Sequence, residues 1–373
     1  MSHSPLRGIA FAATLALLMS APALAQQYHR TDLTTDLSSV SPTAANVDSD
    51  LKNPWGLARG TTSPWWVSDN GTGLSTLYNA TGMKVLLSGG TQPAVVIPTP
   101  NGTGTAAPTG TVLNPTTGFL VGPNAKAFFL FVTEDGTISG WNPTVSPNAV
   151  LIKNNAGKAF YKGCAIAQTT SGRAFFYATN FLTGKVEVYD SNFHRVHVGD
   201  DDGSFRLPGL PKSWSPFNIQ NIGGSLVVTF AHRTPGSLDE DHGAGLGHVG
   251  IFDLSGHLIQ RLMDGPWFNA PWGVALAPGD FGKFTHRLLI GNFGDGTIQG
   301  FNAFTGVHEG AMLDDTTGQT LSIGGLWALS FGGDSTNNGT ATTLFFSAGA
   351  NDENDGIFGQ LTAVSPEQPG NTQ

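Results

Sequence analysis

From about residue 27 onward, apolar and polar residues alternate with the period of two that is typical of β-strands with one buried face. One segment type begins with glycine, continues with alternating apolar residues and, in most copies, ends on an aromatic residue followed by Asn or Asp. Such an ending indicates a turn after the strand. The six copies begin at Gly73, Gly136, Gly184, Gly247, Gly296 and Gly356.

A nearly continuous apolar run precedes each copy, as expected for a strand covered on both faces. These runs are Trp65–Val67, Phe128–Val132, Phe175–Ala178, Leu226–Phe230, Leu288–Ile290 and Leu344–Phe346. A third element, rich in small residues, stands before each run. Its copies begin at or near Asn53, Asn114, Lys162, Pro216, Asn269 and Leu326.

Three strands and a turn into a fourth, repeated six times, predict an all-β fold, a six-bladed β-propeller with four-stranded blades. We expect the strand of small residues to be innermost, because blades crowd together at the central channel. The segment Tyr28–Leu37 has no partner of its own, so it should add the outer strand of the last blade and close the ring. The predicted organisation is a signal peptide over 1–25, one propeller over 26–364 and a polar C-terminal tail over 365–373.

The N-terminal segment has the features of a secretory signal peptide. Arg7 precedes an apolar run from Ile9 to Met19, and Ala23 and Ala25 are the small residues that a signal peptidase reads before Gln26. The run is too short to span a bilayer, and no later stretch predicts a membrane span. We therefore expect export to the periplasm or the extracellular space.

The net charge and the cysteine content limit the classes of partner and the covalent links that the sequence predicts. Removal of residues 1–25 leaves 17 basic and 27 acidic residues, a formal charge of −10. That sign argues against nucleic acid or an anionic membrane as a partner. Cys164 is the single cysteine and lies in an apolar run, so it reads as a core residue without a disulfide.

Acidic and amide side chains gather at one predicted end of the propeller. The turns between second and third strands lie on the same face as the entries to the innermost strands. Oxygen ligands from several blades suit a hard cation, so Glu134, Asn180 and Asn292 are candidate ligands for calcium. Tight turns also use these residue types for conformational reasons alone. The binding residues expected at this channel mouth are Asn53, Trp55, Asp69, Asn70, Glu134, Asp135, Asn180, Asn218, Asn292, Asp295 and Asp352.

A long insertion between Phe230 and Val249 distinguishes the fourth blade. It carries three histidines and several acids, but their spacing matches no compact zinc motif. A solvated loop is the simpler interpretation.

Trp55, Trp272 and Trp327 recur at one repeat position. Packing between blades is favoured for them over a stacking platform for a ligand.

The motif Asn53–Ala58 followed by Trp66–Tyr78 resembles an uncharacterised family of exported bacterial β-propellers associated with the PEP-CTERM sorting system. Asn269–Gly273 and Gly291–Gly296 resemble the same family, which implies a propeller and export and no particular activity. The tail Ser365–Gln373 has no apolar anchor of the kind that this sorting system uses.

More distantly, the blades resemble NHL-repeat proteins and the gluconolactonase-like six-bladed propellers. The latter resemblance implies a channel metal and lactone hydrolysis. Their first inner strand opens with Glu-Gly-Pro, where this chain has Asn53-Pro54-Trp55 and no acidic ligand.

Two functions are consistent with these patterns. No serine-nucleophile elbow, zinc-protease motif or phosphate-binding loop occurs in the sequence. The first function is therefore a non-catalytic module that binds a small molecule or an extracellular protein. The alternative is a calcium-dependent hydrolase of the lactonase or esterase type with its site at the channel mouth. The sequence leaves open whether the protein is an enzyme.

Overall fold

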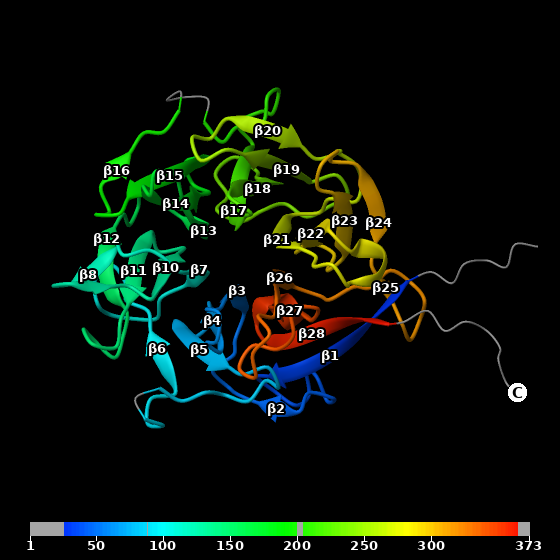
Figure 1. Cartoon of the computed structure of the whole chain (residues 1–373), viewed down its shortest axis with the longest axis horizontal. Coiled ribbons are helices and arrows are strands. Elements are labelled where there is room, and N and C mark those ends of the chain that lie inside the picture. Colours follow the sequence, from blue (N-terminus) through cyan, green and yellow to red (C-terminus); the bar gives the residue numbers. More distant parts are fainter. Residues whose placement is uncertain (1–25, 88, 200–203, 365–373) are drawn as a thin grey trace, which may run out of the picture.

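A computed structural model of the chain shows six β-sheets arranged as a ring around a central axis (Figure 1). It describes residues 26–87, 89–199 and 204–364, so the signal peptide and the C-terminal tail expected from the sequence lie outside the described residues. The predicted six-bladed propeller with four-stranded blades is confirmed. In the described ranges, no helix has the length and apolar character needed to cross a membrane.

The first five blades are antiparallel sheets whose strands follow one another outward from the channel (Figure 1). Blade 1 contains β3 (Pro54–Ala58), β4 (Trp65–Asp69), β5 (Leu74–Tyr78) and β6 (Ala94–Val96). Blade 2 contains β7 (Pro108–Leu113), β10 (Phe129–Thr133), β11 (Thr137–Trp141) and β12 (Val150–Asn154), with the hairpin β8 (Leu120–Gly122) and β9 (Ala125–Lys126) inserted. Blade 3 contains β13 (Tyr161–Gln168), β14 (Ala174–Asn180), β15 (Lys185–Asp190) and β16 (Arg195–Val196). Blade 4 contains β17 (Trp214–Ile222), β18 (Ser225–His232), β19 (Gly247–Phe252) and β20 (Leu258–Arg261). Blade 5 contains β21 (Pro271–Leu276), β22 (Arg287–Asn292), β23 (Ile298–Asn302) and β24 (His308–Ala311), with the short helix η1 (Gly282–Phe284) between its first two strands.

The sixth blade joins the two ends of the described chain. Its strands are β26 (Leu326–Phe331), β27 (Leu344–Ala348), β28 (Ile357–Val364) and the N-terminal β1 (Gln27–Thr35), which pairs antiparallel with β28. Two short strands, β2 (Asn46–Val47) and β25 (Leu313–Asp314), pair parallel with β1. Figure 1 shows β1 lying beside β28, so the predicted closure of the ring is confirmed.

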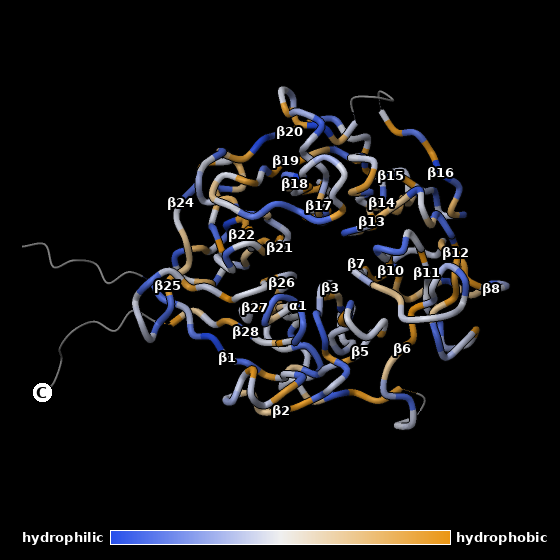
Figure 2. Tube along the Cα trace, turned by 180° about the vertical axis from the view of Figure 1, so that it is seen from behind, coloured by the Kyte–Doolittle hydropathy of each residue, from blue (hydrophilic) through white to orange (hydrophobic). Residues whose placement is uncertain are grey.

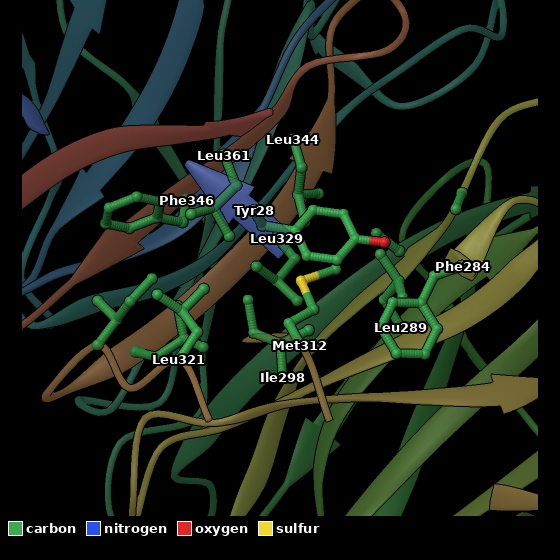
Figure 3. Packing of buried hydrophobic residues seen from close by; sticks show 14 of the residues in the cluster. Tyr28, Phe284, Leu289, Ile298, Met312, Leu321, Leu329, Leu344, Phe346 and Leu361 are labelled. Carbon is green, nitrogen blue, oxygen red and sulfur yellow. The ribbon is translucent and has the colours of Figure 1, made fainter. Parts of the chain in front are cut away.

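Tyr28 anchors the closing strand in the core between blades 5 and 6 (Figure 3). Its side chain is fully buried, and its hydroxyl donates a hydrogen bond to the carbonyl of Phe281 at 3.0 Å. The Tyr28 ring also lies 5.9 Å from that of Phe284 in a stacked arrangement. A buried tyrosine with a satisfied hydroxyl contributes both area and a directional contact, which fixes β1 in register.

The inner strand of blade 2 differs from the sequence-based expectation. It is β7, which ends at Leu113, so Asn114 follows the inner strand instead of opening it. Gly110 explains why β7 is the inner strand, because a Cβ atom at this position would lie 2.7 Å from the backbone nitrogen of Cys164 in the next blade. The Asn114 amide instead donates hydrogen bonds to the carbonyls of Gly118 and Ala127.

Cys164 is buried in inner strand β13, as expected for a core residue. Burial raises the pKa of its thiol, because no charged group nearby favours the thiolate.

Candidate functional site

Large aromatic side chains from several inner strands meet at the centre of the ring. The rings of Trp55 and Trp327 are stacked with their centroids 3.4 Å apart, and Trp272 meets both of them edge-on. Phe217 packs against the same pair. All four rings are buried, which agrees with the packing role favoured for the tryptophans. We call this group the aromatic plug.

Lys162 extends from the inner strand β13 onto the aromatic plug and is almost completely buried. Its side chain is 2% exposed, and its ammonium lies 4.8 Å from the ring centroid of Trp55. The Lys162 Nζ atom is 2.8 Å from Oε1 of Glu134 and 3.3 Å from Oε2 of Glu240. A buried ammonium is stable only when it is paired with an opposite charge, so the buried position of Lys162 requires these carboxylates.

Glutamates from three other blades lie near this ammonium: two of them contact it, and the third, Glu353, interacts with its charge. Glu134 comes from the β10–β11 turn of blade 2, and Glu240 comes from the insertion between β18 and β19 of blade 4. Glu353 comes from the turn α1 (Ala350–Glu353), between β27 and β28 of blade 6. We call Glu134, Lys162, Glu240 and Glu353 the mouth cluster.

The innermost pair of the mouth cluster is ionised. Burial alone would lower the pKa of Lys162, but the negative charges of Glu240 and Glu134 outweigh it and raise that pKa above the ordinary value. Burial alone would raise the pKa of Glu240, but the Lys162 charge lowers it below the ordinary carboxyl value. Both groups therefore carry full charge at neutral pH.

Among the described residues Glu353 forms no ion pair, although the imidazole of His242 lies near enough to interact with its charge. Burial, followed by repulsion from Glu240, raises the pKa of Glu353 to about 7, although the Lys162 charge opposes the shift. Glu353 is therefore close to half protonated at neutral pH.

His242 lies on the solvent side of the mouth cluster. Its Nε2 atom is 3.9 Å from Oε1 of Glu240, and its side chain is about 48% exposed. The contact with Glu240 raises the pKa of His242, and partial burial opposes that shift. The imidazole meets the ring of Phe293 edge-on, with 5.0 Å between centroids.

The backbone that carries Glu353 is conformationally unusual. Asn351, Asp352 and Glu353 have φ values of 52°, 53° and 65°, which form a left-handed turn without glycine. Each such residue costs about 1–2 kcal/mol relative to the right-handed form, and such strain is concentrated at binding and catalytic sites. Figure 2 shows α1 next to the inner strands β3 and β26 at the centre of the ring.

Four of the predicted mouth residues lie at this cluster. Trp55 lies beneath the Lys162 ammonium, and Asn53 accepts a hydrogen bond from Nε1 of Trp327 at 3.1 Å. Asn70 links Glu134 to Asn53, because its Nδ2 donates to Glu134 at 3.0 Å and its Oδ1 lies 3.5 Å from Nδ2 of Asn53.

The other predicted amides hold loops in place. The Asn180 side chain donates to Glu187 and to a backbone carbonyl, and its oxygen accepts the backbone NH of Phe160. The Asn292 amide similarly contacts the backbone of residues 267 and 269. Asn218 donates to the carbonyl of Trp272 at 2.8 Å.

The remaining predicted acids lie apart from the mouth cluster in their contacts. Asp69 is fully buried, and one of its oxygens accepts hydrogen bonds from the backbone and side chain of Thr76. Asp135 accepts the backbone NH of residue 107, and the exposed Asp295 closes a turn onto residue 297. Asp352 is exposed on α1.

The three candidate calcium ligands have other partners. The Glu134 oxygens face Lys162 and Asn70, and the amide oxygens of Asn180 and Asn292 each accept backbone NH groups. Within the part of the chain that the structure describes, no three His, Cys, Asp or Glu side chains are grouped to hold a metal ion. The three side chains therefore already have protein partners, and calcium binding at them stays a prediction.

The histidines of the fourth-blade insertion are divided among separate acids. His232 pairs with Asp241 at 2.6 Å, and His248 pairs with Asp264 at 2.5 Å. His242 contacts Glu240 instead.

Lys162 and Glu240 were not among the site residues predicted from the sequence, whereas His242 was considered only as a histidine of the fourth-blade insertion and Glu353 only as part of an acidic turn at the mouth. One signal pointed to the first of them: a lysine beside Gly163 in a strand of small and apolar residues must reach a carboxylate if it is buried. The identity of these carboxylates depends only on how the blades are arranged around the channel.

The fold and this site define a six-bladed β-propeller with a buried ion-pair cluster over an aromatic plug at one end of its channel. Two uncharacterised proteins of Acanthamoeba polyphaga mimivirus are similar in sequence. One is 32% identical over 329 residues, covering 85% of this chain and 76% of the viral protein. The other is 30% identical over 340 residues, covering 87% and 84%. The chain belongs to the family of these proteins, and no family model matches it.

Solved propellers share the architecture at low sequence identity. Virginiamycin B lyase from Staphylococcus aureus aligns with a TM-score of 0.52 and 12% identity over 91% of this chain and 100% of the lyase. A glucose dehydrogenase aligns with a TM-score of 0.51 and 13% identity over 90% of this chain and 99% of the enzyme. These likenesses show the fold alone.

Proposed function

We propose that the protein is an exported binding module whose channel mouth takes a small ligand carrying an ammonium or guanidinium group. The observation that supports the proposal is the excess of carboxylates over cations in the mouth cluster. Three glutamates share one lysine, and burial together with repulsion from Glu240 raises the pKa of Glu353 to about 7. A ligand cation beside Glu353 would supply the missing charge and displace its proton.

Aromatic faces at the mouth suit the same kind of ligand. Phe160 and Phe293 are partly buried at the edge of the aromatic plug, and Phe293 is stacked on Trp327 at 3.8 Å. Cations bind to the faces of such rings, with a contribution of about 0.5–2 kcal/mol each. The plug itself already accommodates one ammonium, that of Lys162.

The charge state of the buried pair favours binding over covalent chemistry. A lysine nucleophile must be neutral to attack a substrate, whereas Glu240 and Glu134 hold the Lys162 ammonium in its charged form. Glu240 is in turn held ionised by Lys162 and is nearly inaccessible. These two residues therefore build the site and do not react.

Acid–base catalysis is the second candidate, and Glu353 favours it. A carboxyl with a pKa near 7 can exchange a proton with a bound substrate at neutral pH, and His242 is a second titratable group nearby. The calcium-dependent hydrolase expected from the gluconolactonase resemblance would use the same mouth.

Isothermal titration with phenethylammonium, and with the neutral 2-phenylethanol as its matched control, tests the proposal. We expect saturable binding of the cation only, with release of about half a proton per ligand at pH 7, measured in buffers of different ionisation enthalpy. Glu353→Gln should abolish the proton release and weaken binding. Asp280→Asn, an exposed acid at the opposite end of blade 5, should change neither.

Other outcomes separate the alternatives. Equal binding of the neutral alcohol, or cation binding without proton release in the wild-type protein, would contradict the proposal. Calcium chloride that binds stoichiometrically and displaces phenethylammonium would favour the metal-dependent alternative. Turnover of lactones or aryl esters that is lost in Glu353→Gln would make the protein an enzyme.

A further inference from the structure

A cavity opens between blades 3 and 4, beside the β14–β15 turn and the start of β17. It has a volume of about 400 Å³, within the range of small-molecule sites. Its apolar wall is formed by Leu207, Leu210 and Phe230, with Trp214 beside them.

The polar lining of this cavity is cationic. Arg206, Lys212 and Arg233 border it, and Lys185 lies at its edge. No aspartate or glutamate is among the described residues that line it. The chain has 27 acidic and 18 basic residues, so this lining is opposite in sign to the protein as a whole.

Neighbouring contacts hold two of the lining side chains in place. Trp214 packs against His248 and His232, with ring centroids 4.3 and 5.0 Å apart. The Arg233 guanidinium lies 5.6 Å from the ring centroid of Phe181 and donates to the carbonyl of Ser237 at 3.4 Å. Because both groups are positioned before any ligand arrives, little ordering is required on binding.

Phe181 separates this cavity from the mouth cluster. Lys162 lies 5.7 Å from the Phe181 ring centroid, and Arg233 lies 5.6 Å from it. The two sites are therefore adjacent but have separate walls, and they have opposite chemical preferences.

We propose that the cavity between blades 3 and 4 binds a small aromatic carboxylate. Its ring would lie against Trp214 and the leucines, and its carboxylate would pair with Arg206, Lys212 and Arg233. Arginine presents planar pairs of NH donors that match a carboxylate, and charge-assisted hydrogen bonds of this kind are the strong ones.

Isothermal titration with naphthalene-2-carboxylate tests the proposal, with naphthalene-2-carboxamide as the uncharged probe of the same shape. We expect one saturable site for the carboxylate and affinity for the carboxamide at least about tenfold weaker, because the carboxamide lacks the charge that strengthens hydrogen bonds to the cationic lining. This comparison uses the unaltered protein, so it does not depend on a variant that folds.

The double variant Arg206→Gln/Lys212→Gln should weaken carboxylate binding by at least about tenfold. Arg173→Gln, an exposed cation at the turn that ends the inner strand of blade 3, is the matched control and should leave it unchanged. Glu353→Gln should also leave it unchanged, which separates this site from the mouth. Equal affinity for carboxamide and carboxylate, no saturable carboxylate binding, or full affinity in a correctly folded double variant would each overturn the proposal.

Discussion

Replacing Lys162 by methionine tests whether the mouth cluster depends on its single buried cation. Methionine fills a similar volume, so the main change is the loss of the ammonium that lies 2.8 Å from Glu134 and 3.3 Å from Glu240. The Glu240 side chain is only 5% exposed and would keep a charge without a buried partner. Breaking a buried ion pair in this way costs about 3–5 kcal/mol of the free energy of unfolding.

The pH dependence of Lys162→Met follows from Glu240. In the wild-type protein the pKa of Glu240 is lowered, so ionised Glu240 stabilises the folded state. This stabilisation is fully present above pH 4.5, the ordinary carboxyl pKa, and is lost as the pH falls through the lowered pKa. In Lys162→Met the largest favourable charge is lost, so burial raises the pKa of Glu240 relative to the wild-type protein, although the contacts with His242 and with the backbone remain. The penalty then grows as the pH rises, and stability relative to wild type recovers as the pH falls.

Urea unfolding at about pH 5 and about pH 8 measures both effects. Lys162→Met should lose about 3–5 kcal/mol at the higher pH and clearly less at the lower one. Adding Glu240→Gln should restore a large part of the loss, because the uncompensated charge is removed. Lys153→Met, on the outer strand β12, should be nearly neutral. A loss below about 1 kcal/mol, or an equal loss at both pH values, would refute the reasoning.

Three further results are expected. Tyr28→Phe should lower the free energy of unfolding by about 1–2 kcal/mol, because the hydrogen bond to Phe281 is lost, and Tyr28→Ala should lower it by about 3–5 kcal/mol, because the buried ring is lost. Urea unfolding measures both effects, and a neutral Tyr28→Ala would mean that β1 does not stabilise the ring. Glu353→Gln should stabilise the protein by about 2 kcal/mol at pH 8 and very little near pH 4.5. A carboxyl whose pKa is raised from 4.5 to about 7 penalises the folded state increasingly as the pH rises between these two values, and fully above the higher one. A loss of stability at pH 8 would contradict this charge assignment. The exported protein should begin at Gln26, checked by intact mass of the secreted or periplasmic fraction, and a mass that retains residues 1–25 would contradict the signal peptide.

The fold was predictable because each blade repeats one local pattern. The glycine-initiated strands and the apolar runs before them are short-range signals, and β4, β14 and β22 lie within one or two residues of the predicted runs. The inner strand of blade 2 was misplaced because a polar Asn114 resembled the Asn residues that open other blades. The close backbone approach at Gly110, which selects the true strand, appears only in three dimensions.

The site was only partly predictable, since its members are neighbours around a ring and not along the chain. Glu134 was found because acidic turns at the predicted mouth are visible in the sequence. Asn180 and Asn292 carry the same signal, yet their amides hold backbone in place, a role that turn chemistry also explains. Glu240 lies 78 residues from Lys162, and nothing local links the two.

The mouth cluster also indicates why a bound cation would be recognised specifically. Lys162 already shows how an ammonium is held there, between carboxylates and over the face of Trp55. That position is filled by the protein itself, and Glu353, on a strained turn at the edge of the mouth, is the carboxyl of the cluster that does not contact Lys162. A neutral ligand would form no ion pair with Glu353, and an anion would be repelled by its ionised form. Under the proposed function a cation would gain an ion pair with Glu353, so selection by charge would follow from the number of carboxylates and lysines that the blades bring together.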